Sequence, residues 1–443
     1  MRNSRTRRPL VLTAAVLAAS VAVSTATASA ATTRLTPTPP HADATPPADA
    51  KPPGNAEPSA DATPPAGTKP QVKLPPLDPA TLRAAIAGLP DRTVTGAMVE
   101  ITGSAGHWSG TSGVGNVKTG EPVPADGRFR AGSITKVFTA AVVLQLVAEH
   151  RIDLDGSVQH YLPGLLPAGY PTVTVRQLLD HTSGLPTGGH LGDPQGDPNQ
   201  WFVDHRFDSW TPRQIVADAM TAPRDFAPGT SQRYNGLNYY VAGLLIEKVT
   251  GRTYADEVRA RVLRPLNLRS TYVLDRRDPR LPGPHAHGYV AVTRDGKTVL
   301  ADVSEQSPYP WAEGGMISSD ADLTRFIRAI FQGRVVPRSV LAAMFTVPDV
   351  KYADDSHCNL GPDTGHACFS AGLMRFTLPN GVTAWGKTGS RPGYTSGVFA
   401  TRDLRRVAVY SLNPTGNKDG SESPYVMRLA AAAFDPDLLR PSS

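Results

Sequence analysis

Residues 130–138 read Arg-Ala-Gly-Ser-Ile-Thr-Lys-Val-Phe and lead into an apolar run from Val137 to Val147. The run is rich in Ala, Val and Leu, which predicts a helix buried on most sides. Ser133 then stands in the first turn, where unpaired backbone N–H groups and the positive end of the helix dipole favour negative charge. Lys136 follows three residues later on the same face. We expect this helix to be the centre of the fold.

The pairing of Ser133 with Lys136 suggests a nucleophile. A Lys in so apolar a segment loses hydration, which lowers its pKa and makes a neutral amine attainable near pH 7. A serine hydroxyl beside such an amine is activated. However, Ser-x-x-Lys fixes only two positions, and about one chance occurrence is expected in this chain. If the match is a chance one, Ser133 is an ordinary helix cap and Lys136 is a residue whose ammonium reaches the surface.

The first thirty residues have the three parts of a secretory signal. Four Arg lie within the first eight residues, an apolar stretch runs from Leu10 to Val23, and Ala28-Ser29-Ala30 is a small-residue cleavage site. The apolar stretch is short for a membrane span. We therefore expect residues 1–30 to be removed and the protein to be secreted, without a stable membrane anchor.

Residues 31–76 are dominated by Pro, Ala, Thr and Asp and contain no Ile, Phe, Tyr or Trp. Such a segment predicts a disordered linker. Residues 77–443 are then the folded part, long enough for one large domain or two lobes that share a core. The formal charge of +6 falls by four when the signal is removed, so the charge gives no reason to expect nucleic-acid binding.

The two cysteines, Cys358 and Cys368, lie close together in a loop rich in Gly, Asp and His. In an exported chain such a pair predicts one disulfide. His357 and His366 flank the pair, but oxidised sulfur cannot ligate a metal. His285 and His287 lack an evident third ligand. We expect neither a metal nor another cofactor.

Strand and helix patterns divide the folded part into three sections. A helix is predicted at 78–89, followed by paired strands at 95–102 and 107–115. Helices and loops fill roughly 150–280, with helices at 175–179, 212–220, 239–249 and 254–262. Strands return at 373–378, 382–385, 397–400 and 407–412, and a last helix covers 425–433. This order predicts an α+β fold, in which an antiparallel sheet joins both ends of the chain and a mostly helical lobe is inserted.

Three further segments carry recognisable chemistry. Phe-Ala-Pro-Gly at 226–229 precedes Tyr-Asn-Gly-Leu-Asn-Tyr-Tyr at 234–240, Gly-Lys-Thr-Gly-Ser occupies 386–390, and Val-Arg-Gln-Leu-Leu-Asp-His-Thr-Ser-Gly occupies 175–184. With the serine motif in front, this order resembles the serine β-lactamase and penicillin-binding-protein superfamily over residues 80–435. The branch that fits best holds class C β-lactamases, secreted D-alanyl-D-alanine carboxypeptidases and related esterases.

The resemblance implies a β-lactamase-like fold and acyl transfer. Ser133 would attack a carbonyl, while Lys136 and Tyr234 would move the protons. The Tyr234 phenol serves only if neighbouring cations lower its pKa. The backbone N–H groups of Ser133 and Ser390 would form the oxyanion hole.

Two substrate-binding residues follow from the same resemblance. Lys387 and Thr388 would hold a substrate carboxylate. A second Lys-Thr-Gly at 118–120 precedes Ser133 and leads into Glu-Pro. The family's functional copy lies on a late strand, so we interpret Lys118 as a solvated turn residue.

One position departs from the family pattern. Tyr-x-Asn is usual in the family, with the Asn amide orienting the substrate's amide and the Lys, but the third residue here is Gly236. Asn235 or Asn238 would have to reach into the site, and neither is in register. The departure indicates altered specificity, slow turnover or a degenerate enzyme.

The sequence thus predicts a secreted, monomeric serine hydrolase that forms an acyl-enzyme. A penicillin-binding peptidase of the D-alanyl-D-alanine carboxypeptidase kind is favoured, acting on a small molecule or peptide with a free carboxylate. A class C-type β-lactamase and an esterase are the alternatives on the same fold. A catalytically weak binding module is the alternative from another class of protein. The motifs leave open which of Lys136 and Tyr234 is the base, since coupled groups titrate as a set.

Overall fold

The structure is a computed structural model that describes residues 72–354, 356–359 and 361–440. The predicted signal segment and nearly all of the predicted linker lie outside these residues. Leu74, which the sequence assigns to the linker, is packed into the core. No helix of the described residues is long and apolar enough to cross a membrane.

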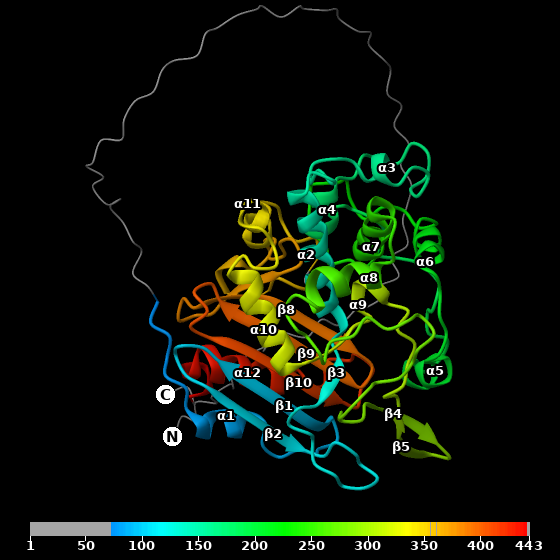
Figure 1. Cartoon of the computed structure of the whole chain (residues 1–443). Coiled ribbons are helices and arrows are strands. Elements are labelled where there is room, and N and C mark those ends of the chain that lie inside the picture. The colour runs from blue at the N-terminus through cyan, green and yellow to red at the C-terminus, as the bar shows by residue number, and fades with distance from the viewer. Residues whose placement is uncertain (1–71, 355, 360, 441–443) are drawn as a thin grey trace, which may run out of the picture. The chain divides into compact units, whose positions relative to one another are not determined.

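A six-stranded antiparallel sheet joins the two ends of the folded chain (Figure 1). Its strand order is β2-β1-β10-β9-β8-β7. The strands span Val94–Thr102 (β1), Trp108–Gly113 (β2), Met374–Thr377 (β7), Thr383–Arg391 (β8), Tyr394–Thr401 (β9) and Val407–Pro414 (β10). The register places Val99 of β1 opposite Tyr410 of β10. The first strand therefore pairs with the last.

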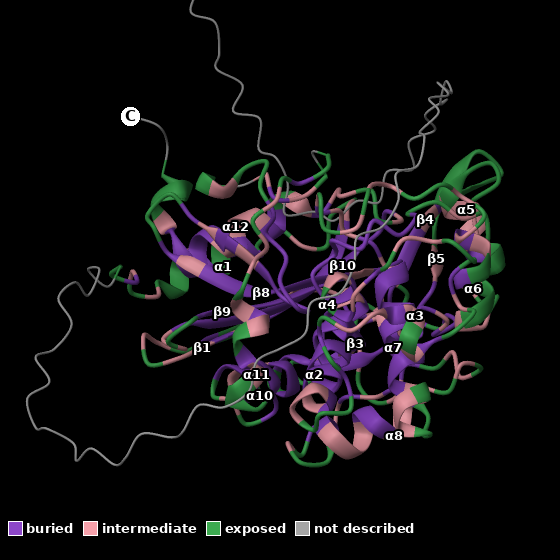
Figure 2. Ribbon diagram, turned by 90° about the horizontal axis from the view of Figure 1, so that it is seen from above, coloured by how far each residue is buried: buried purple, intermediate pink, exposed green. Residues whose placement is uncertain are grey.

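Helices cover both faces of this sheet. The first helix, α1 (Pro79–Ala85), packs with the last, α12 (Ser423–Phe434), over one face. On the other face, α10 (Asp320–Phe331) lies against β9, β10 and β1. All residues of β9 and β10 are buried, because both sides of these strands are covered (Figure 2).

The inserted lobe surrounds two long buried helices, α2 (Thr135–Ala148) and α7 (Leu237–Thr250), which pack against each other. Shorter helices pack against them: α3 (Val158–Tyr161), α4 (Val175–Leu179), α6 (Pro212–Ala219), α8 (Tyr254–Val258), α9 (Trp311–Gly314) and α11 (Arg338–Leu341). A further helix, α5 (Pro198–His205), packs against the strand at Tyr289–Arg294. Side-chain caps start several of them, as Thr174 does for α4.

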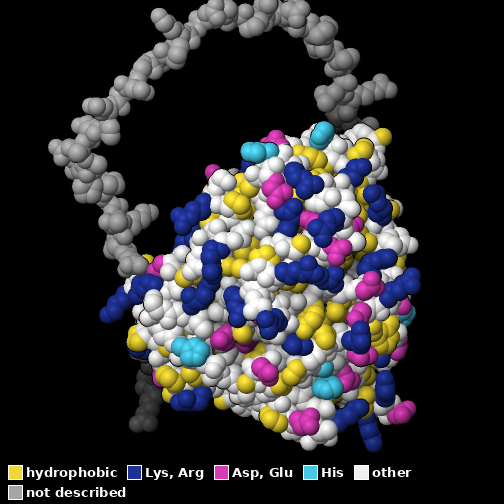
Figure 3. Space-filling model, viewed as in Figure 1, with side chains coloured by type: hydrophobic (Ala, Val, Ile, Leu, Met, Phe, Trp, Pro, Cys, Tyr) yellow, Lys and Arg dark blue, Asp and Glu magenta, His cyan; other side chains and the backbone are white. Residues whose placement is uncertain are grey.

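The α+β class and the inserted helical lobe are confirmed by this arrangement, and the outer strands and helices lie where the sequence predicts them. The elements that were not predicted include the amphipathic helix α10, the short helix α9, the two-stranded pair β3 (Arg128–Arg130) and β6 (Ile317–Ser319), and the hairpin of β4 (Tyr289–Arg294) and β5 (Lys297–Asp302). On the face shown in Figure 3, acidic side chains are interspersed among basic ones.

Candidate active site

Ser133 lies in a single 3-10 turn, Gly132–Ile134, directly before α2. The α-helix therefore begins two residues later than expected. Thr135 fixes the turn, since its hydroxyl donates to the carbonyl of Gly132 (2.7 Å) and accepts from the N–H of Met316 (3.2 Å). Ser133 is partly exposed, although both of its chain neighbours are buried. The turn thus presents one hydroxyl from an otherwise closed surface.

Lys136 is fully buried beneath that hydroxyl. Its ammonium Nζ donates to Ser133 Oγ (3.1 Å) and to the backbone carbonyl of Glu313 (2.7 Å), and it forms an ion pair with the Glu313 carboxylate. Burial alone would lower the pKa of Lys136, but the Glu313 carboxylate and Tyr234 outweigh that effect and raise it above its ordinary value. The sequence-based expectation of a lowered pKa is therefore wrong, because it lacked the carboxylate.

Tyr234 lies between two ammonium groups. Lys136 Nζ is 5.1 Å and Lys387 Nζ is 4.6 Å from the centre of its ring. Its hydroxyl oxygen is buried, with no partner of good hydrogen-bond geometry among the described residues. Burial raises the pKa of the phenol, but Lys136 and then Lys387 overcome that and bring the pKa below its ordinary value. The condition set for a phenol that accepts a proton is met.

Lys387 and Thr388 lie inside strand β8, both buried. The Lys387 ammonium donates to the Thr388 carbonyl (3.1 Å) and also faces the ring of Phe369. Burial, with the charge of Lys136 adding to it, lowers the pKa of Lys387. In this structure Lys387 is therefore directed at Tyr234, and a role for it in carboxylate binding stays a prediction.

The edge of β8 meets the serine turn at Ser390. The neighbouring strand β7 pairs only with residues 383–386 of β8, so residues 387–391 have a free edge beside the turn. Two glycines permit the contact: a Cβ at Gly132 would lie 2.5 Å from Ser390 N, and one at Gly389 would lie 1.9 Å from the Ala131 carbonyl oxygen. The structure thus brings the backbone of Ser390 next to Ser133, as an oxyanion hole requires.

The structure does not bring the Asn235 amide to the site. Its Nδ2 donates to the carbonyls of Leu185 (2.8 Å) and Pro186 (3.0 Å), and its Oδ1 accepts from the N–H of Leu237 (2.8 Å). Every polar atom of this buried side chain is occupied by backbone groups. The predicted substrate contact of Asn235 is therefore not supported.

Asn238 is also turned away from the serine. Its side chain contacts Ser183 Oγ (2.6 Å) and His181 Nδ1 (3.2 Å). His181 is buried beneath the ring of Tyr234 (centroids 4.7 Å apart), where burial lowers its pKa well below the ordinary value. These residues form the floor under Tyr234.

Glu313 is the site residue that sequence reasoning missed. It lies on α9, which packs against both α2 and α7. No local pattern marks a single Glu before Gly-Gly. A general argument would have indicated it: a buried ammonium is costly without a carboxylate partner, and Lys136 had none in the predicted site.

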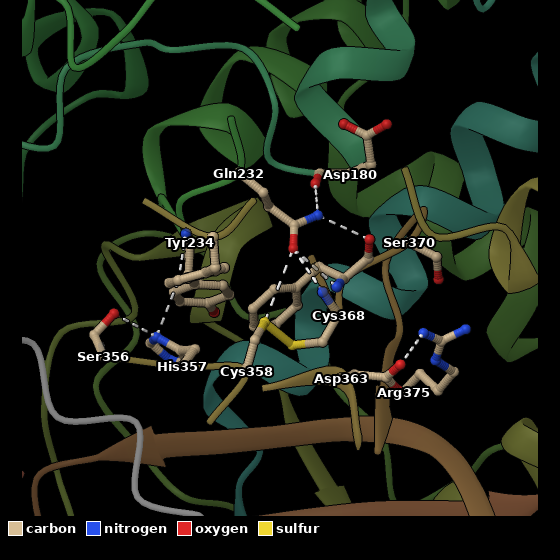
Figure 4. The surroundings of a disulfide bond; sticks show 12 residues. Asp180, Gln232, Tyr234, Ser356, His357, Cys358, Asp363, Cys368, Ser370 and Arg375 are labelled. Atoms are coloured by element: carbon tan, nitrogen blue, oxygen red, sulfur yellow. Dashed lines mark hydrogen bonds and ion pairs between the residues drawn. A yellow bond between two sulfur atoms is a disulfide. The ribbon is translucent and has the colours of Figure 1, made fainter. Parts of the chain in front are cut away.

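The predicted disulfide between Cys358 and Cys368 is present and lies beside Tyr234 (Figure 4). The buried Gln232, two residues before Tyr234 in sequence, connects the tyrosine to the disulfide. Its Oε1 accepts from the N–H groups of Cys368 (2.9 Å) and Phe369 (3.1 Å). The Tyr234 N–H donates to the hydroxyl of Tyr352 (2.8 Å), from the segment before the disulfide. The cross-linked loop thus forms one wall around the phenol.

The remaining candidates lie elsewhere. Lys118 is exposed in a turn, and His287 contacts Asp302 (2.6 Å). Within the part of the chain that the structure describes, no group of three His, Cys, Asp or Glu residues is placed to hold a metal ion.

A partly exposed serine, a buried lysine, a phenol between two cations and a strand edge that faces the serine together define a serine hydrolase of the acyl-transfer type. Residues 82–432 match the family model described as Beta-lactamase. The chain therefore belongs to the beta-lactamase family, which includes the penicillin-binding proteins.

Three similar proteins illustrate the range of that family. Penicillin-binding protein 4* of Bacillus subtilis (strain 168) is 25% identical over 307 residues, covering 66% of this chain and 62% of that protein. Esterase EstB of Burkholderia gladioli is 31% identical over 290 residues, covering 57% of this chain and 71% of that protein. A D-stereospecific amidohydrolase from Streptomyces sp. has 35% identity and a TM-score of 0.67, covering 81% of this chain and 98% of that one. The chain thus spans less than two thirds of the first relative.

Proposed function

We propose that this chain is a secreted serine amidohydrolase that forms an acyl-enzyme on Ser133 and cleaves amide bonds next to a D-amino acid, with the D-alanyl-D-alanine carboxypeptidase reaction as the expected form. One observation carries the proposal: the Lys136 ammonium contacts Ser133 Oγ (3.1 Å) and lies 5.1 Å from the centre of the Tyr234 ring, so the three groups lie together around a partly exposed serine.

The chemistry follows from these positions. Ser133 Oγ attacks the carbonyl carbon and gives its proton to the Tyr234 oxygen, while the N–H groups of Ser133 and Ser390 stabilise the negative oxygen of the adduct. The C–N bond then breaks, and Tyr234 returns the proton to the leaving amine. In the second half, water gives a proton to Tyr234 and attacks the ester, and the acid leaves as Ser133 regains its proton.

One observation favours a D-configured amide over other acyl donors. The similar amidohydrolase from Streptomyces is described as D-stereospecific, and the match covers nearly all of that chain. The penicillin-binding relative adds the expectation that a β-lactam enters the same site. Thr388 and Lys387, next to the site on β8, are our candidates for binding the carboxylate of a peptide substrate.

The export that we propose has separate support. The N-terminal segment has the composition of a cleavable signal, and the Cys358–Cys368 disulfide fits an oxidising compartment. Mass spectrometry of protein recovered from the growth medium of an expressing host tests this, since loss of the first thirty residues is expected.

Labelling with a fluorescent penicillin tests the acyl-enzyme, with Ser133→Ala as the control. A Ser133-dependent band that lasts for hours on a denaturing gel is the expected result, because a penicillin-binding peptidase deacylates slowly. A band that disappears while the drug is consumed identifies a β-lactamase instead. If no band forms, the penicillin-binding proposal is wrong.

Substrate preference is tested with matched pairs: D- and L-alaninamide, a blocked peptide ending in D-Ala-D-Ala and its D-Ala-L-Ala isomer, and a p-nitrophenyl ester. Faster Ser133-dependent cleavage of the D-amides or D-peptides is expected. Cleavage of the ester alone favours an esterase, as in the relative EstB. Tight binding without turnover of any substrate, undiminished in Ser133→Ala, identifies a binding module.

A further inference from the structure

Lys136 contacts two oxygens of Glu313, which can only accept, and the hydroxyl of Ser133, which can accept or donate. Its three contacts are Ser133 Oγ at 3.1 Å, the Glu313 carbonyl oxygen at 2.7 Å and the Glu313 carboxylate. A carbonyl and a carboxylate cannot donate, so two of these contacts each require an N–H from Lys136. An ammonium has three such hydrogens, and the remaining one points at Ser133. A neutral amine could also satisfy both oxygens of Glu313 with its two hydrogens, so it is the ion pair with the Glu313 carboxylate that favours the charged lysine, which donates its third hydrogen to the nucleophile.

Gly236 leaves the space that Glu313 fills. Its backbone is ordinary right-handed helix (φ −62°, ψ −33°), so the conformation does not call for glycine. The neighbouring space does: a Cβ at this position would lie 3.3 Å from Oε2 and 3.4 Å from Cδ of Glu313. Any longer side chain pointing this way would meet the carboxylate. Glycine therefore stands where the resemblance predicts Asn, and the Glu313 carboxylate lies in the space that a side chain at this position would enter.

We propose that Glu313 is a positioning residue that takes over the place of the absent Asn, holds Lys136 as a charged donor to Ser133, and thereby leaves Tyr234 as the group that accepts the serine proton. This inference rests on the proposed acyl-transfer function and adds a residue and a proton route to it. It also accounts for Gly236 without assuming a degenerate site.

The support beneath Glu313 is firm enough for such a role. The Ala312 carbonyl accepts from the buried Thr139 hydroxyl of α2 (2.7 Å). On the other side, Gly243 of α7 lies so close that a Cβ there would be 2.6 Å from the Ala312 side chain. The carboxylate itself is not sealed in, because the Glu313 side chain keeps 22% of its exposure. The backbone beside Glu313 is thus held in place, while part of its side chain remains accessible to solvent.

Several charged or titratable groups act on the ion pair of Glu313 and Lys136, and all of them affect how the site titrates. Lys387, Lys418 and Arg391 act on it as cations, and Tyr234 is the phenol; His181 and His357 lie against the Tyr234 ring. Glu313 is the acid that acts directly on Lys136. Removing its charge makes proton binding less favourable at both Lys136 and Tyr234. Both limbs of a pH–rate profile should then move to lower pH.

Kinetics of four variants test the proposal: Glu313→Gln, Glu313→Ala, Gly236→Asn, and Glu313→Ala combined with Gly236→Asn. We expect each single variant to acylate about a hundredfold more slowly, at the lower end of proton-transfer effects, with KM nearly unchanged. The double variant should recover several-fold over Glu313→Ala, because an Asn amide can then reach Lys136. Glu149→Gln, an ion-paired glutamate just beyond the other end of α2, is the matched control and should match wild type.

A second measurement does not depend on any substrate. In protein labelled with 13C at lysine Cε, the Lys136 resonance, assigned by its loss in Lys136→Met, should keep its ammonium shift to higher pH in wild type than in Glu313→Gln. If acylation fails in wild type but this difference is seen, the proposed function is wrong and the Glu313 contact is right. If the Lys136 titration is the same in both proteins, or the double variant is no better than Glu313→Ala, the role of Glu313 is refuted.

Discussion

The backbone of Gly132 lies directly against that of Ser390, so that a Cβ on Gly132 would come within 2.5 Å of the Ser390 nitrogen. Gly132 also has a φ of +51°, in the left-handed region that side chains disfavour. This contact joins the turn that carries the nucleophile to the free edge of β8. The two N–H groups that would face a substrate oxyanion are positioned by it.

Substituting Gly132→Ala should therefore abolish acylation or slow it at least about a hundredfold, the scale of losing an oxyanion-hole donor. The measurement is the rate of penicillin labelling. Gly120→Ala is the matched control, since Gly120 also has a positive φ (+75°) but open space around it. Each substitution costs about 1 kcal/mol of backbone strain, which thermal unfolding reports. Equal labelling rates in the two variants would contradict the contact.

Lys387→Met should raise the pKa of Tyr234, because one of the two cations that lower it is removed. If the phenolate is the base, the acidic limb of the acylation rate then moves to higher pH. The pH dependence of labelling or of amide cleavage measures this. Lys118→Met, in the exposed Lys-Thr-Gly at 118–120, should leave the profile unchanged. A shift to lower pH, or none, would show that Lys387 does not act on the phenol.

Acid should weaken the fold partly through His357, whose pKa burial and then Lys387 lower to about 4. Its unfolded-state pKa is about 6.5, so between these values the unfolded chain binds a proton that the folded chain does not. Its contribution is complete above about pH 6.5 and is lost as the pH falls toward 4, on the order of 1 kcal/mol per pH unit. Asp180, with a pKa raised by burial to about 6, acts in the opposite direction over part of this range.

Comparison with His357→Gln isolates that contribution. Urea unfolding at pH 7 and pH 5 should show that wild type loses more stability on acidification than the variant does. Equal losses would mean that His357 is protonated in the folded protein.

Removing the disulfide by Cys358→Ser with Cys368→Ser should lower stability by about 2–3 kcal/mol, as expected for a short closed loop. It should also slow acylation, because Gln232 and Tyr352 tie this loop to Tyr234. Unfolding and labelling rates measure the two effects. Wild type treated with a reductant should behave like the double variant. A stable variant with unchanged labelling would show that the loop does not support the phenol.

The sequence predicted those parts of the molecule that local patterns determine. The apolar run after Ser133, the strand pattern around Val99 and Val409, and the ordered motifs at 234–240 and 386–390 each express their structure within a few residues. For the same reason, Ser133, Lys136, Tyr234 and Lys387 were brought together correctly by their order along the chain.

Glu313 could not be predicted, because its contact with Lys136 joins residues 177 apart. That contact follows from how α9 packs, which no local pattern encodes. The predicted direction of the Lys136 pKa shift was wrong for the same reason, because burial was foreseen but the compensating carboxylate was not. The predicted substrate contact of Asn235 is not supported for a related reason. An amide close to the site in sequence can equally donate to the carbonyls of a loop, and Asn235 does so here.

The pairing of β1 with β10 has a consequence for how the enzyme is made. Val99 meets Tyr410 only after about 300 further residues have been synthesised, and the nucleophile on its turn is translated long before Tyr234, Glu313 and Ser390. Such long-range pairing delays assembly until the end of the chain is available. A nascent or prematurely terminated chain carries Ser133 but not the groups that we propose to activate it, so on this proposal the chain becomes active only when its last strand has been added.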